Sequence, residues 1–580
     1  MRAFKHEGRL FQILFAALLC ASIFPDRLLA DDKNESNTPA KAAPAKSDAP
    51  KMEAPISLTE RERWLLDRVE LLEKRVEELE SKSHPAATAS AEAATPPITV
   101  GASTPVAGTV TTAGTFGQVT PGGSNATPAR VGVAAVATQA TDKGKSGATK
   151  TPATEPFAFA DWSWLTGNAR TKDTPYDTKF FTPEFRADIN YVYDFNHPKD
   201  DTIGGSSEVF RSNEVHVTDI GVGGDFHYNN VRGRILSQIG LYSQTTARND
   251  ASPARGQWNL ADAYRYVSEA YGGYHFNVLH GVNVDAGIFL SYIGLFSYYQ
   301  FDNWAYQPSY VSSNTPWFFN GLRVQIYPTE KLKIEPWFIN GWQSYGRFNN
   351  RSGLGMQIAW RPNSKVAIVA NQYGLGQDAL ATPGRTRLHT DDSIQVKYYD
   401  NPETFFDKAA FSVTLDAGCE TGGGVSCYGN RKGGPKQSFL GLMVYDRLWF
   451  HNDLYGLTIG GGRINNPGRY LVLLPPINGA TAASGTPYFT ENPGDPYKAW
   501  DISGTFDYMP SQYITFRWEY NHRAANVPYF SGPGGITPTS CPTAPTFLNI
   551  CGSPGAFVPG FTPDLRKTED RGTLAILVKF

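Results

Sequence analysis

The feature that most constrains the fold is an alternation of apolar and polar residues that recurs from about residue 181 and continues to the last residue. A period of two places successive side chains on opposite faces of a β-strand. We therefore expect the last residues to form a strand with one apolar face. One face carries Leu574, Ile576, Val578 and Phe580, and the other carries Thr573, Ala575 and Lys579, with Leu577 as an exception.

The same split is found in residues 185–195, 500–508 and 514–521. In the first of these stretches, Val192 is the apolar exception on the polar face. A strand with one apolar and one polar face also occurs in soluble β-sandwiches. Strand length and the pattern of connections therefore have to decide between a sandwich and a barrel.

We predict about sixteen strands, most of them close to the ~9–11 residues that cross a bilayer at a tilt. Turns after even-numbered strands are short, as at Asn229-Asn230, whereas connections after odd-numbered strands are long, with 346–352 as the exception. This sorting is typical of an outer-membrane barrel, and a sandwich has no reason for it. The predicted strands are 184–195, 214–228, 231–241, 265–276, 282–291, 317–327, 332–345, 353–361, 365–374, 389–399, 406–416, 438–449, 454–464, 499–509, 513–523 and 570–580.

The fold class predicted from these patterns is all-β, a transmembrane antiparallel up-and-down β-barrel. A barrel closes its last strand on its first, so a chain that ends within a strand fits this class. An even number of strands puts both ends of the barrel on the periplasmic side. The terminal Phe580 is similar to the insertion signal of bacterial outer-membrane proteins, which implies the barrel assembly machinery as a partner.

The first thirty residues have the features of a secretory signal peptide. Arg2, Lys5 and Arg9 form a basic region, an apolar stretch runs from 10 to 24, and Ala30 offers a cleavage site. Together with the barrel, this signal predicts the outer membrane of a Gram-negative bacterium, with the N-terminal region in the periplasm.

The expected domain organisation is a signal peptide at 1–30, a disordered segment at 31–56, a coiled coil at 57–82, a disordered Ala/Thr/Pro/Gly-rich linker at 83–156, a lead-in segment at 157–180 and the barrel at 181–580. A lone helix as short as 57–82 is marginal in water, so its heptad pattern predicts a homo-oligomer, a dimer or a trimer. The alternative is a solvated charged helix. The seam consists of Leu58, Leu65, Val69, Leu72, Val76 and Leu79.

Four cysteines follow the signal peptide, and they fall into two close pairs. Cys419 and Cys427 lie in one Gly-rich connection, and Cys541 and Cys551 lie in a Pro-rich one. Because exported proteins reach an oxidising compartment, we expect two local disulfides rather than four free thiols. The spacing does not match a zinc site, and we expect no metal and no cofactor.

Charged residues on the polar faces of the strands are candidates for the lining of a channel. Charge facing lipid costs several kcal/mol per residue, whereas charge facing a wet lumen costs little. Both signs are present and the net charge is −2, so strong ion selectivity and nucleic-acid binding are not indicated. Arg232 and Arg234 form a basic ladder, or they pair with acids on neighbouring strands. The candidates are Arg186, Asp188, Arg232, Arg234, Glu269, Arg323, Lys397, Lys408, Arg517 and Glu519, together with Lys333, Glu335, Asp416 and Asp507.

The connection 292–316 is unusually aromatic. So many aromatic rings are costly to expose to water. One interpretation is that the segment folds into the lumen as a constriction, with Asp302, Asn303, Trp304 and Gln307 along the path. The other is that the rings extend the strands and belong to an interfacial girdle. The sequence does not decide between them.

Catalytic motifs are absent from the sequence or weak. The runs Gly422–Gly424 and Gly460–Gly462 lack the strand–turn–helix setting of a phosphate-binding loop. His389 with Asp391 and Asp392, and His522 near Glu519, are the pairs that an active site would use, and chance proximity explains both better. We expect no catalytic residues and no enzymatic activity.

Three runs of sequence resemble the β-barrel porins of the OmpL-like type: Asn314 to Gly321, Pro328 to Trp337 and Asn340 to Gln343. Glu269-Ala270-Tyr271 resembles the same family. The likeness covers about 180–580 and is strongest in 265–400. It implies an outer-membrane porin, a water-filled channel for passive diffusion of small hydrophilic solutes. The alternative is a barrel-anchored surface structural or adhesion protein whose long loops bind partners. Expected partners are outer-membrane lipid and small solutes, and no nucleic acid.

Overall fold

The fold was examined in a computed structural model of the chain, which divides into two units, 1–118 and 119–580. In the first unit it describes only Lys74, which is helical and exposed. The described residues of the second unit are 155–199, 201, 203, 208–247, 250, 252, 257–347, 351–376, 384–422, 425–429, 436–467, 497–536 and 562–580.

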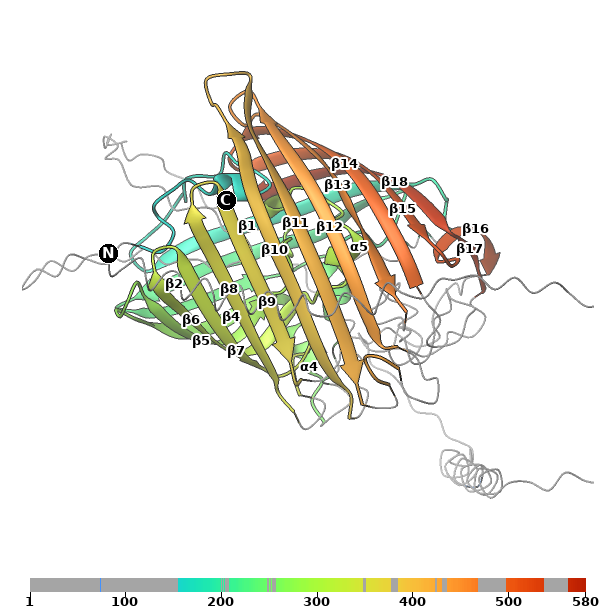
Figure 1. The fold of residues 1–580 in the computed structure, drawn as a ribbon, viewed down its shortest axis with the longest axis horizontal. Coiled ribbons are helices and arrows are strands. Elements are labelled where there is room, and N and C mark those ends of the chain that lie inside the picture. The colour runs from blue at the N-terminus through green and yellow to red at the C-terminus, as the bar shows by residue number, and fades with distance from the viewer. Residues whose placement is uncertain are drawn as a thin grey trace, which may run out of the picture. The chain divides into compact units, whose positions relative to one another are not determined.

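Sixteen antiparallel strands form a closed barrel (Figure 1), which confirms the predicted fold class and strand number. In ring order the strands are β1-β18-β15-β14-β13-β12-β11-β10-β9-β8-β7-β6-β5-β4-β3-β2. Their bounds are β1 (Phe181–Asp194), β2 (Val215–Tyr228), β3 (Val231–Ser237), β4 (Val267–Phe276), β5 (Val282–Leu290), β6 (Phe318–Thr329), β7 (Leu332–Ile339), β8 (Gly353–Asn363), β9 (Val366–Gly374), β10 (Thr386–Asp400), β11 (Phe406–Thr421), β12 (Ser438–Phe450), β13 (Tyr455–Asn466), β14 (Tyr497–Ser511), β15 (Ile514–Ala525) and β18 (Thr568–Lys579).

Connection length follows the predicted parity. Short turns join β2 to β3, β6 to β7 and β14 to β15, and long connections follow the odd strands up to β13 and also β15. The expected exception disappears, because β7 ends at Ile339 rather than at residue 345, which leaves 340–352 as a longer connection. We call the two ends of the barrel the short-turn end and the long-loop end.

Closure of the ring joins the first strand to the last. β1 pairs with β18 from Arg186 opposite Lys579 to Asp194 opposite Arg571. The amide of Phe580 donates to the carbonyl of Phe185 at 2.9 Å. The ring of Phe580 lies 6.0 Å from that of Phe185 and 5.3 Å from that of Tyr513, so the seam is covered by aromatic side chains.

The turn between β2 and β3 shows how local sequence fixes a hairpin. Asn229 and Asn230 have φ values of 46° and 68°. Two consecutive positive φ angles are the signature of the two-residue turn that matches strand twist, and asparagine tolerates them better than most residues. The pair of asparagines therefore sets the register of this hairpin.

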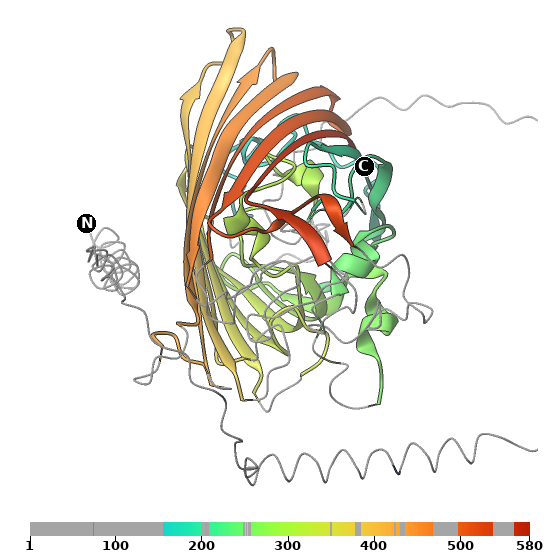
Figure 2. The same ribbon diagram turned by 90° about the vertical axis from the view of Figure 1, so that its right-hand side faces the viewer.

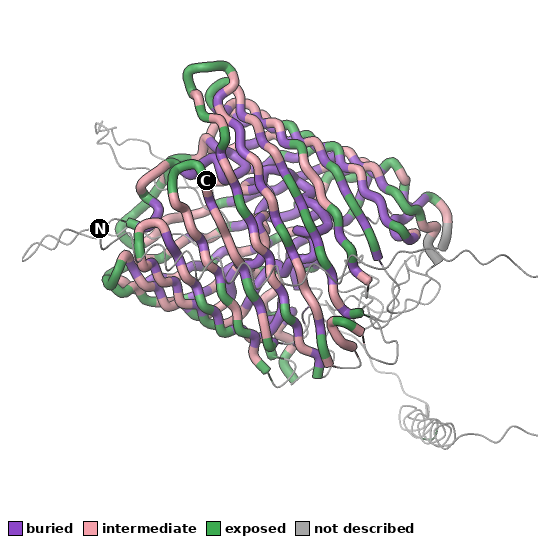
Figure 3. Tube along the Cα trace, in the orientation of Figure 1, coloured by how far each residue is buried: buried purple, intermediate pink, exposed green. Residues whose placement is uncertain are grey.

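Burial alternates along the strands, so that one face of the sheet is buried and the other exposed (Figure 3). In β14, Trp500, Ile502 and Phe506 are exposed while Asp501 and Asp507 are buried. The polar face is therefore inside the barrel and the apolar face outside, the reverse of a soluble protein and the pattern of a barrel surrounded by lipid.

Aromatic rings gather on the outer face near the short-turn end. The rings of Phe181 and Phe226 lie 4.6 Å apart, and those of Tyr455 and Tyr508 lie 5.7 Å apart. A row of this kind resembles the aromatic girdles at membrane interfaces. It is built from strand ends.

The barrel interior holds two segments from different parts of the chain (Figure 2). One is the connection 291–317, with the short helices η5 (Gln300–Asp302) and α5 (Tyr310–Ser313). The other is residues 155–171, with η2 (Ser163–Leu165). We call them the lumen loop and the lead-in plug. The β3–β4 connection adds α3 (Tyr242–Thr245) and α4 (Leu260–Tyr264), and β16 (Phe530–Ile536) pairs with β17 (Thr562–Arg566) in the β15–β18 connection.

Of the two predicted disulfides, Cys419–Cys427 is formed, at the end of β11. Cys541 and Cys551 lie outside the described residues, as do the signal peptide and all six residues of the predicted coiled-coil seam. Among the helices that the structure describes, none is long and apolar enough to cross a membrane.

Candidate functional site: the barrel lumen

The predicted pore-lining residues are all on the inward face of the barrel. Of the ten principal candidates, nine are buried, and the side chain of Lys408 is 11% exposed. Lys333, Glu335, Asp416 and Asp507 are buried as well. These groups do not face open water in the described lumen, because the lumen loop and the lead-in plug occupy it and because the charged groups pair with one another.

Arg234 is the centre of one charge cluster on the wall. It contacts the carboxylates of Glu184 at 2.8 Å, Asp225 at 2.9 Å and Glu269 at 2.7 Å. Three acids around one guanidinium give this part of the wall an acidic excess. Arg186 lies beside it and pairs with Glu184 as well.

Asp285 of β5 bridges two arginines, since Arg232 of β3 lies 3.2 Å and Arg323 of the neighbouring β6 lies 3.1 Å from its oxygens. The guanidinium of Arg323 also sits over the rings of Tyr271 and Phe289, 4.7 and 4.4 Å from their centroids. Of the two interpretations of Arg232 and Arg234, pairing with acids is the one that the geometry supports. Arg234 pairs with acids on its neighbouring strands β2 and β4, and Arg232 pairs with an acid on β5, beyond β4.

Asp507 is held between Arg517 and Arg447, at 2.6 and 2.8 Å. Both arginines also donate to backbone of the lumen loop. Arg517 donates to the carbonyls of Gln300 and Asn303, at 3.0 and 2.7 Å, and Arg447 donates to that of Trp304 at 3.1 Å. The wall arginines therefore bind the lumen loop as well as their acid partner.

Asp302 ties the tip of the lumen loop to the barrel seam. It lies 2.9 Å from Arg186 of β1 and 3.0 Å from Lys579 of β18. Burial by itself raises the pKa of Asp302, but Arg186 and Lys579 outweigh it and hold the pKa below its ordinary value. The carboxylate therefore stays ionised at neutral pH, and the loop is attached to the two strands that close the ring.

Two further wall acids receive hydrogen bonds from the loop. Glu519 accepts from the amides of Tyr306 at 2.6 Å and Gln307 at 2.7 Å. Asp501 accepts from the hydroxyl of Ser309 and the amide of Tyr310, both at 2.8 Å. Since the loop begins at β5 and these acids are on β14 and β15, the loop crosses the lumen from one wall to the other.

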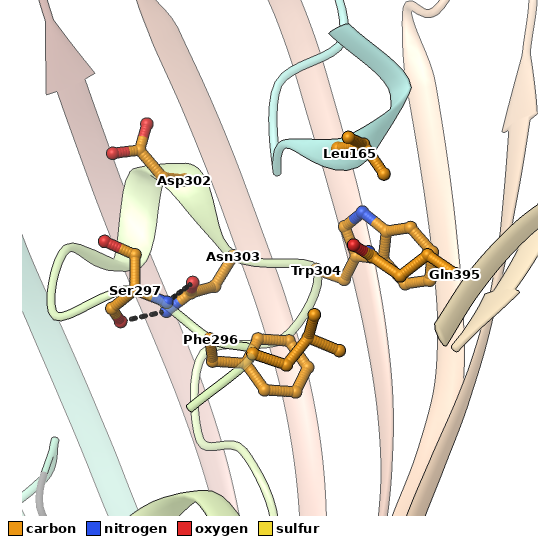
Figure 4. A pocket seen from close by; sticks show the side chains of 8 residues that line it. Leu165, Phe296, Ser297, Asp302, Asn303, Trp304 and Gln395 are labelled. Carbon is orange, nitrogen blue, oxygen red and sulfur yellow. Dashed lines mark hydrogen bonds between the residues drawn. The ribbon is translucent and has the colours of Figure 1, made fainter. Parts of the chain in front are cut away.

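The side chains of the predicted constriction residues are engaged. Asn303 accepts from the amide of Ser297 at 2.7 Å and donates to its carbonyl at 2.8 Å (Figure 4). Trp304 is 2% exposed. Gln307 donates to Glu208. A cavity of about 10 Å³ lies beside them, lined by Leu165, Leu295, Phe296, Ser297, Asp302, Asn303, Trp304 and Gln395. That volume is room for about one water molecule.

The loop aromatics are inside the barrel. Tyr299, Phe301, Trp304 and Tyr306 are at most 5% exposed. Their burial against the wall matches the interpretation in which the segment folds inward, and the girdle interpretation does not describe them.

Helix α5 lies against a part of the wall where side chains are missing. A Cβ built on Gly462 of β13 would come 2.4 Å from Oγ of Ser309, and one on Gly441 of β12 would come 3.0 Å from Cγ2 of Val311. The first distance is shorter than real Cβ contacts and the second is tighter than most of them, so these two glycines make the space in which α5 packs. The run Gly460–Gly462 thus has a packing role.

The histidine pairs considered for catalysis are not assembled as active sites. His522 is on the face opposite Glu519 and bonds Asp570 at 2.7 Å. His389 is buried and lies 2.7 Å from Asp416. Within the described residues, no group of three or more His, Cys, Asp or Glu side chains is placed to hold a metal ion.

The lead-in plug is the part of the lumen that sequence reasoning missed. Trp162, Trp164 and Asn168 are at most 1% exposed, and they occupy the short-turn end of the lumen. The cluster Phe157-Ala158-Phe159-Ala160-Asp161-Trp162-Ser163-Trp164 follows a linker poor in aromatic residues. That change in composition was the available signal.

A closed barrel with an apolar outer face, a charged interior and a long loop folded inward defines the porin-type class of β-barrels. The family model described as "Putative beta-barrel porin-2, OmpL-like" matches residues 186–548. The chain belongs to this family, and it is a porin-like β-barrel of the Gram-negative outer membrane. No curated protein matches its sequence.

Several solved structures are similar over most of their length. The outer membrane channel DcaP of Acinetobacter baumannii is 13% identical, with a TM-score of 0.37 and coverage of 69% of this chain and 96% of that one. OprB of Pseudomonas putida at high pH is 10% identical, with a TM-score of 0.40 and coverage of 69% and 94%. An anion-selective porin from Comamonas acidovorans is 9% identical, with a TM-score of 0.37 and coverage of 69% and 99%.

Proposed function

We propose that this protein is an outer-membrane porin that forms a water-filled channel for passive diffusion of small hydrophilic solutes. The observation that carries the proposal is the charged inner wall. Arg186, Arg234, Glu269, Arg517 and Glu519 all face inward, and a polar interior is what a water-filled channel needs. The family supports the same function.

The wall favours polar solutes without a strong preference for the sign of their charge. Arg232 and Arg323 share Asp285, and Arg447 and Arg517 share Asp507, so each of these clusters has one more positive charge than negative. The cluster around Arg234 has the opposite excess. Clusters with an excess of positive charge and a cluster with an excess of negative charge on the same inner wall give an electric field across the lumen and only weak selectivity between cations and anions.

The direct test is the conductance of the purified full chain in a planar lipid bilayer. We expect discrete current steps, a ratio of cation to anion permeability within a few-fold of one, and current that neutral sugars reduce. A barrel that stays silent over the whole voltage range, in the wild type and in variants with a loosened lumen, contradicts the proposal.

The dense packing of the described lumen favours a second candidate, a surface structural or adhesion protein anchored by its barrel. The β16–β17 hairpin gives the longest connection a small sheet of its own, which offers a structured surface for such a role. Binding of the protein to whole cells or matrix proteins, lost when 526–567 is shortened and unaffected by lumen variants, would support it.

The proposed function also includes how the protein is exported, inserted and assembled. We propose that residues 1–30 are cleaved as a signal peptide, that the barrel assembly machinery inserts the chain by recognising its last strand, and that 57–82 associates two or three copies in the periplasm. Chemical crosslinking of the intact chain, compared with a Leu65→Asp, Leu72→Asp variant, tests the association.

A further inference from the structure

We propose that the lead-in plug, residues 155–171, is a gate that closes the short-turn mouth of the barrel and opens the pore when it is displaced. The inference rests on the proposed porin function. It follows from where the plug is anchored, from what it touches and from how it is joined to the barrel.

The plug crosses the mouth along a diameter. At one end the amide of Phe157 donates to the carbonyl of Glu330, in the β6–β7 turn, at 2.7 Å. At the other end Asn168 donates to Thr515 Oγ1 at 3.1 Å and to the carbonyl of Ser511 at 3.1 Å, beside the β14–β15 turn. Six strands separate the two hairpins on each side of the ring, β8 to β13 on one and β5 to β1 with β18 on the other. The segment therefore spans opposite walls.

The plug also reaches the lumen loop. The amide of Gly167 donates to the carbonyl of Asp302 at 2.9 Å, and the indole of Trp304 donates to the carbonyl of Trp164 at 3.3 Å. Arg447 donates to the carbonyls of Gly167 at 2.6 Å and Trp304 at 3.1 Å, so one wall arginine holds both segments. The cavity left between plug and loop is only about 10 Å³. The two segments together leave no passage for a solute where they meet.

Wall cations cover the aromatic rings of the plug. Arg361 lies 4.6 Å from the ring centroids of Phe157 and Trp162, and Lys397 lies 5.8 Å from that of Trp164. Such contacts between a cation and a ring face are attractive. In this arrangement the plug occupies wall charges that would otherwise be available to a passing solute, so displacement would both widen the mouth and expose those charges.

The plug and the loop are attached differently. Loop residue Asp302 forms ion pairs with two strands, and wall acids Glu519 and Asp501 accept loop amides. The plug is held by ring packing, by cation contacts and by hydrogen bonds to backbone carbonyls and to the Thr515 hydroxyl. Of the two segments, the plug is therefore the easier to remove.

An exposed strap joins the plug to the barrel. Residues 172–174 and 176–180 are exposed, and β1 begins at Phe181. Tyr176 is 77% exposed, with a φ of 63°. Because the strap is not packed into the lumen, the plug can leave the mouth while β1 keeps its pairing with β18.

A single added methyl group at Gly167 would disturb the contact between the plug and the lumen loop. A Cβ added to Gly167 would lie 2.3 Å from the carbonyl oxygen of Asn303 and 2.5 Å from that of Phe301, both backbone atoms that cannot rotate away. A Cβ added to Gly504, on β14, meets nothing within 4 Å. Gly167→Ala and Gly504→Ala thus make the same chemical change, in one case against the loop and in the other into open space.

The test is single-channel recording of the full chain carrying each substitution. For Gly167→Ala we expect the ratio of open to closed time to rise about tenfold, equal to about 1.4 kcal/mol, with no change for Gly504→Ala. Deletion of 155–171 should hold the channel open, whereas deletion of an equal length of the linker, 130–146, should not. Equal open times in all variants would overturn the gate and leave the porin function standing, and silence in all of them would overturn both.

A thiol probe gives a second readout that needs no current. Ala169 is fully buried in the plug, so an Ala169→Cys side chain should react slowly with a water-soluble maleimide in the folded protein. Adding Gly167→Ala should raise that rate by about tenfold, in proportion to the displaced population. Fast labelling in the otherwise wild-type chain would mean that the plug does not close the mouth.

Discussion

The amide of Gly167 donates a hydrogen bond to the carbonyl oxygen of Asp302 across 2.9 Å, although 135 positions separate the two residues (302 − 167). Through its side chain Asp302 also reaches Arg186 and Lys579, the residues that face each other across the barrel seam. One loop tip therefore connects the plug to the closing strands, so disturbance of either is expected to reach the other.

The ion pair between Asp302 and Arg186 should be energetically coupled. We expect a double-mutant cycle of Asp302→Asn and Arg186→Gln to give an interaction free energy of about 1–3 kcal/mol. Both groups are buried, and neutralising one of them removes the counter-charge of the other. The measurement is the free energy of unfolding in detergent micelles by urea titration. Asp173→Asn, at an exposed position, is the control, and a coupling near zero would show that the pair of Asp302 with Arg186 does not contribute to stability.

The lowered pKa of Asp302 predicts how the lumen responds to acid. A carboxyl whose folded-state pKa lies below its ordinary value of 3.8 contributes stability above that value and loses it as the pH falls through the folded-state pKa. We therefore expect open probability to be flat from roughly pH 5 to 8 and to rise only below roughly pH 4, within the ordinary carboxyl range. The Asp302→Asn channel should lack this acid response; an identical response in both proteins assigns it to other carboxyls.

The two apolar exceptions on the inner face should matter for stability. Leu577 and Val192 are fully buried and cluster with Phe301 and Tyr306 of the lumen loop. We expect Leu577→Ala to lower the free energy of unfolding by about 2–5 kcal/mol, because it leaves a cavity. Leu574→Ala is the matched control, since Leu574 is on the same strand but 49% exposed on the outer face. If both variants lost the same free energy of unfolding, the contact of Leu577 with the lumen loop would not contribute to stability.

The disulfide between Cys419 and Cys427 closes a short loop at the end of β11. Peptide mapping without reductant should recover these two cysteines in one linked species, and should recover Cys541 linked to Cys551. Replacing Cys419 and Cys427 by serine should cost about 2–3 kcal/mol of stability by chain entropy. Channel conductance should be unchanged, because the bridge is outside the lumen; a changed conductance would place this loop on the solute path.

Much of the architecture could be predicted because it is written in local patterns. The two-residue period identifies the faces of β14 and β15 without reference to any other strand, and turn residues such as Asn229-Asn230 mark the short end. For the sixteen barrel strands, the errors are confined to strand ends. For β7, the sequence pattern continues past Ile339 into Trp342 and Tyr345, but these rings pack inside the barrel against loops, which ends the strand.

The interior could be predicted only in part. Val192 and Leu577 break the alternation in the sequence. These apolar residues are accommodated on the inner face because they pack with Phe301 and Tyr306 of the lumen loop, a tertiary contact that local sequence does not show. No local pattern shows which loop fills a lumen or that a pre-barrel segment enters it. The charged candidates lie on the inward face, as the two-residue period predicts, but their pairing depends on register between strands, as for Arg232 with Asp285.

The two glycines beneath α5 carry a consequence for how such a channel is sized. Because the helix is seated in the space left by Gly441 and Gly462, its distance from the barrel axis depends on how much the sheet yields to it. Progressively larger residues at these two positions would move α5 progressively further inward. The largest solute that can pass would then become smaller, although the sequence of the lumen loop is unchanged. The width of the lumen therefore depends on residues of the barrel strands as well as on residues of the loop inserted between them.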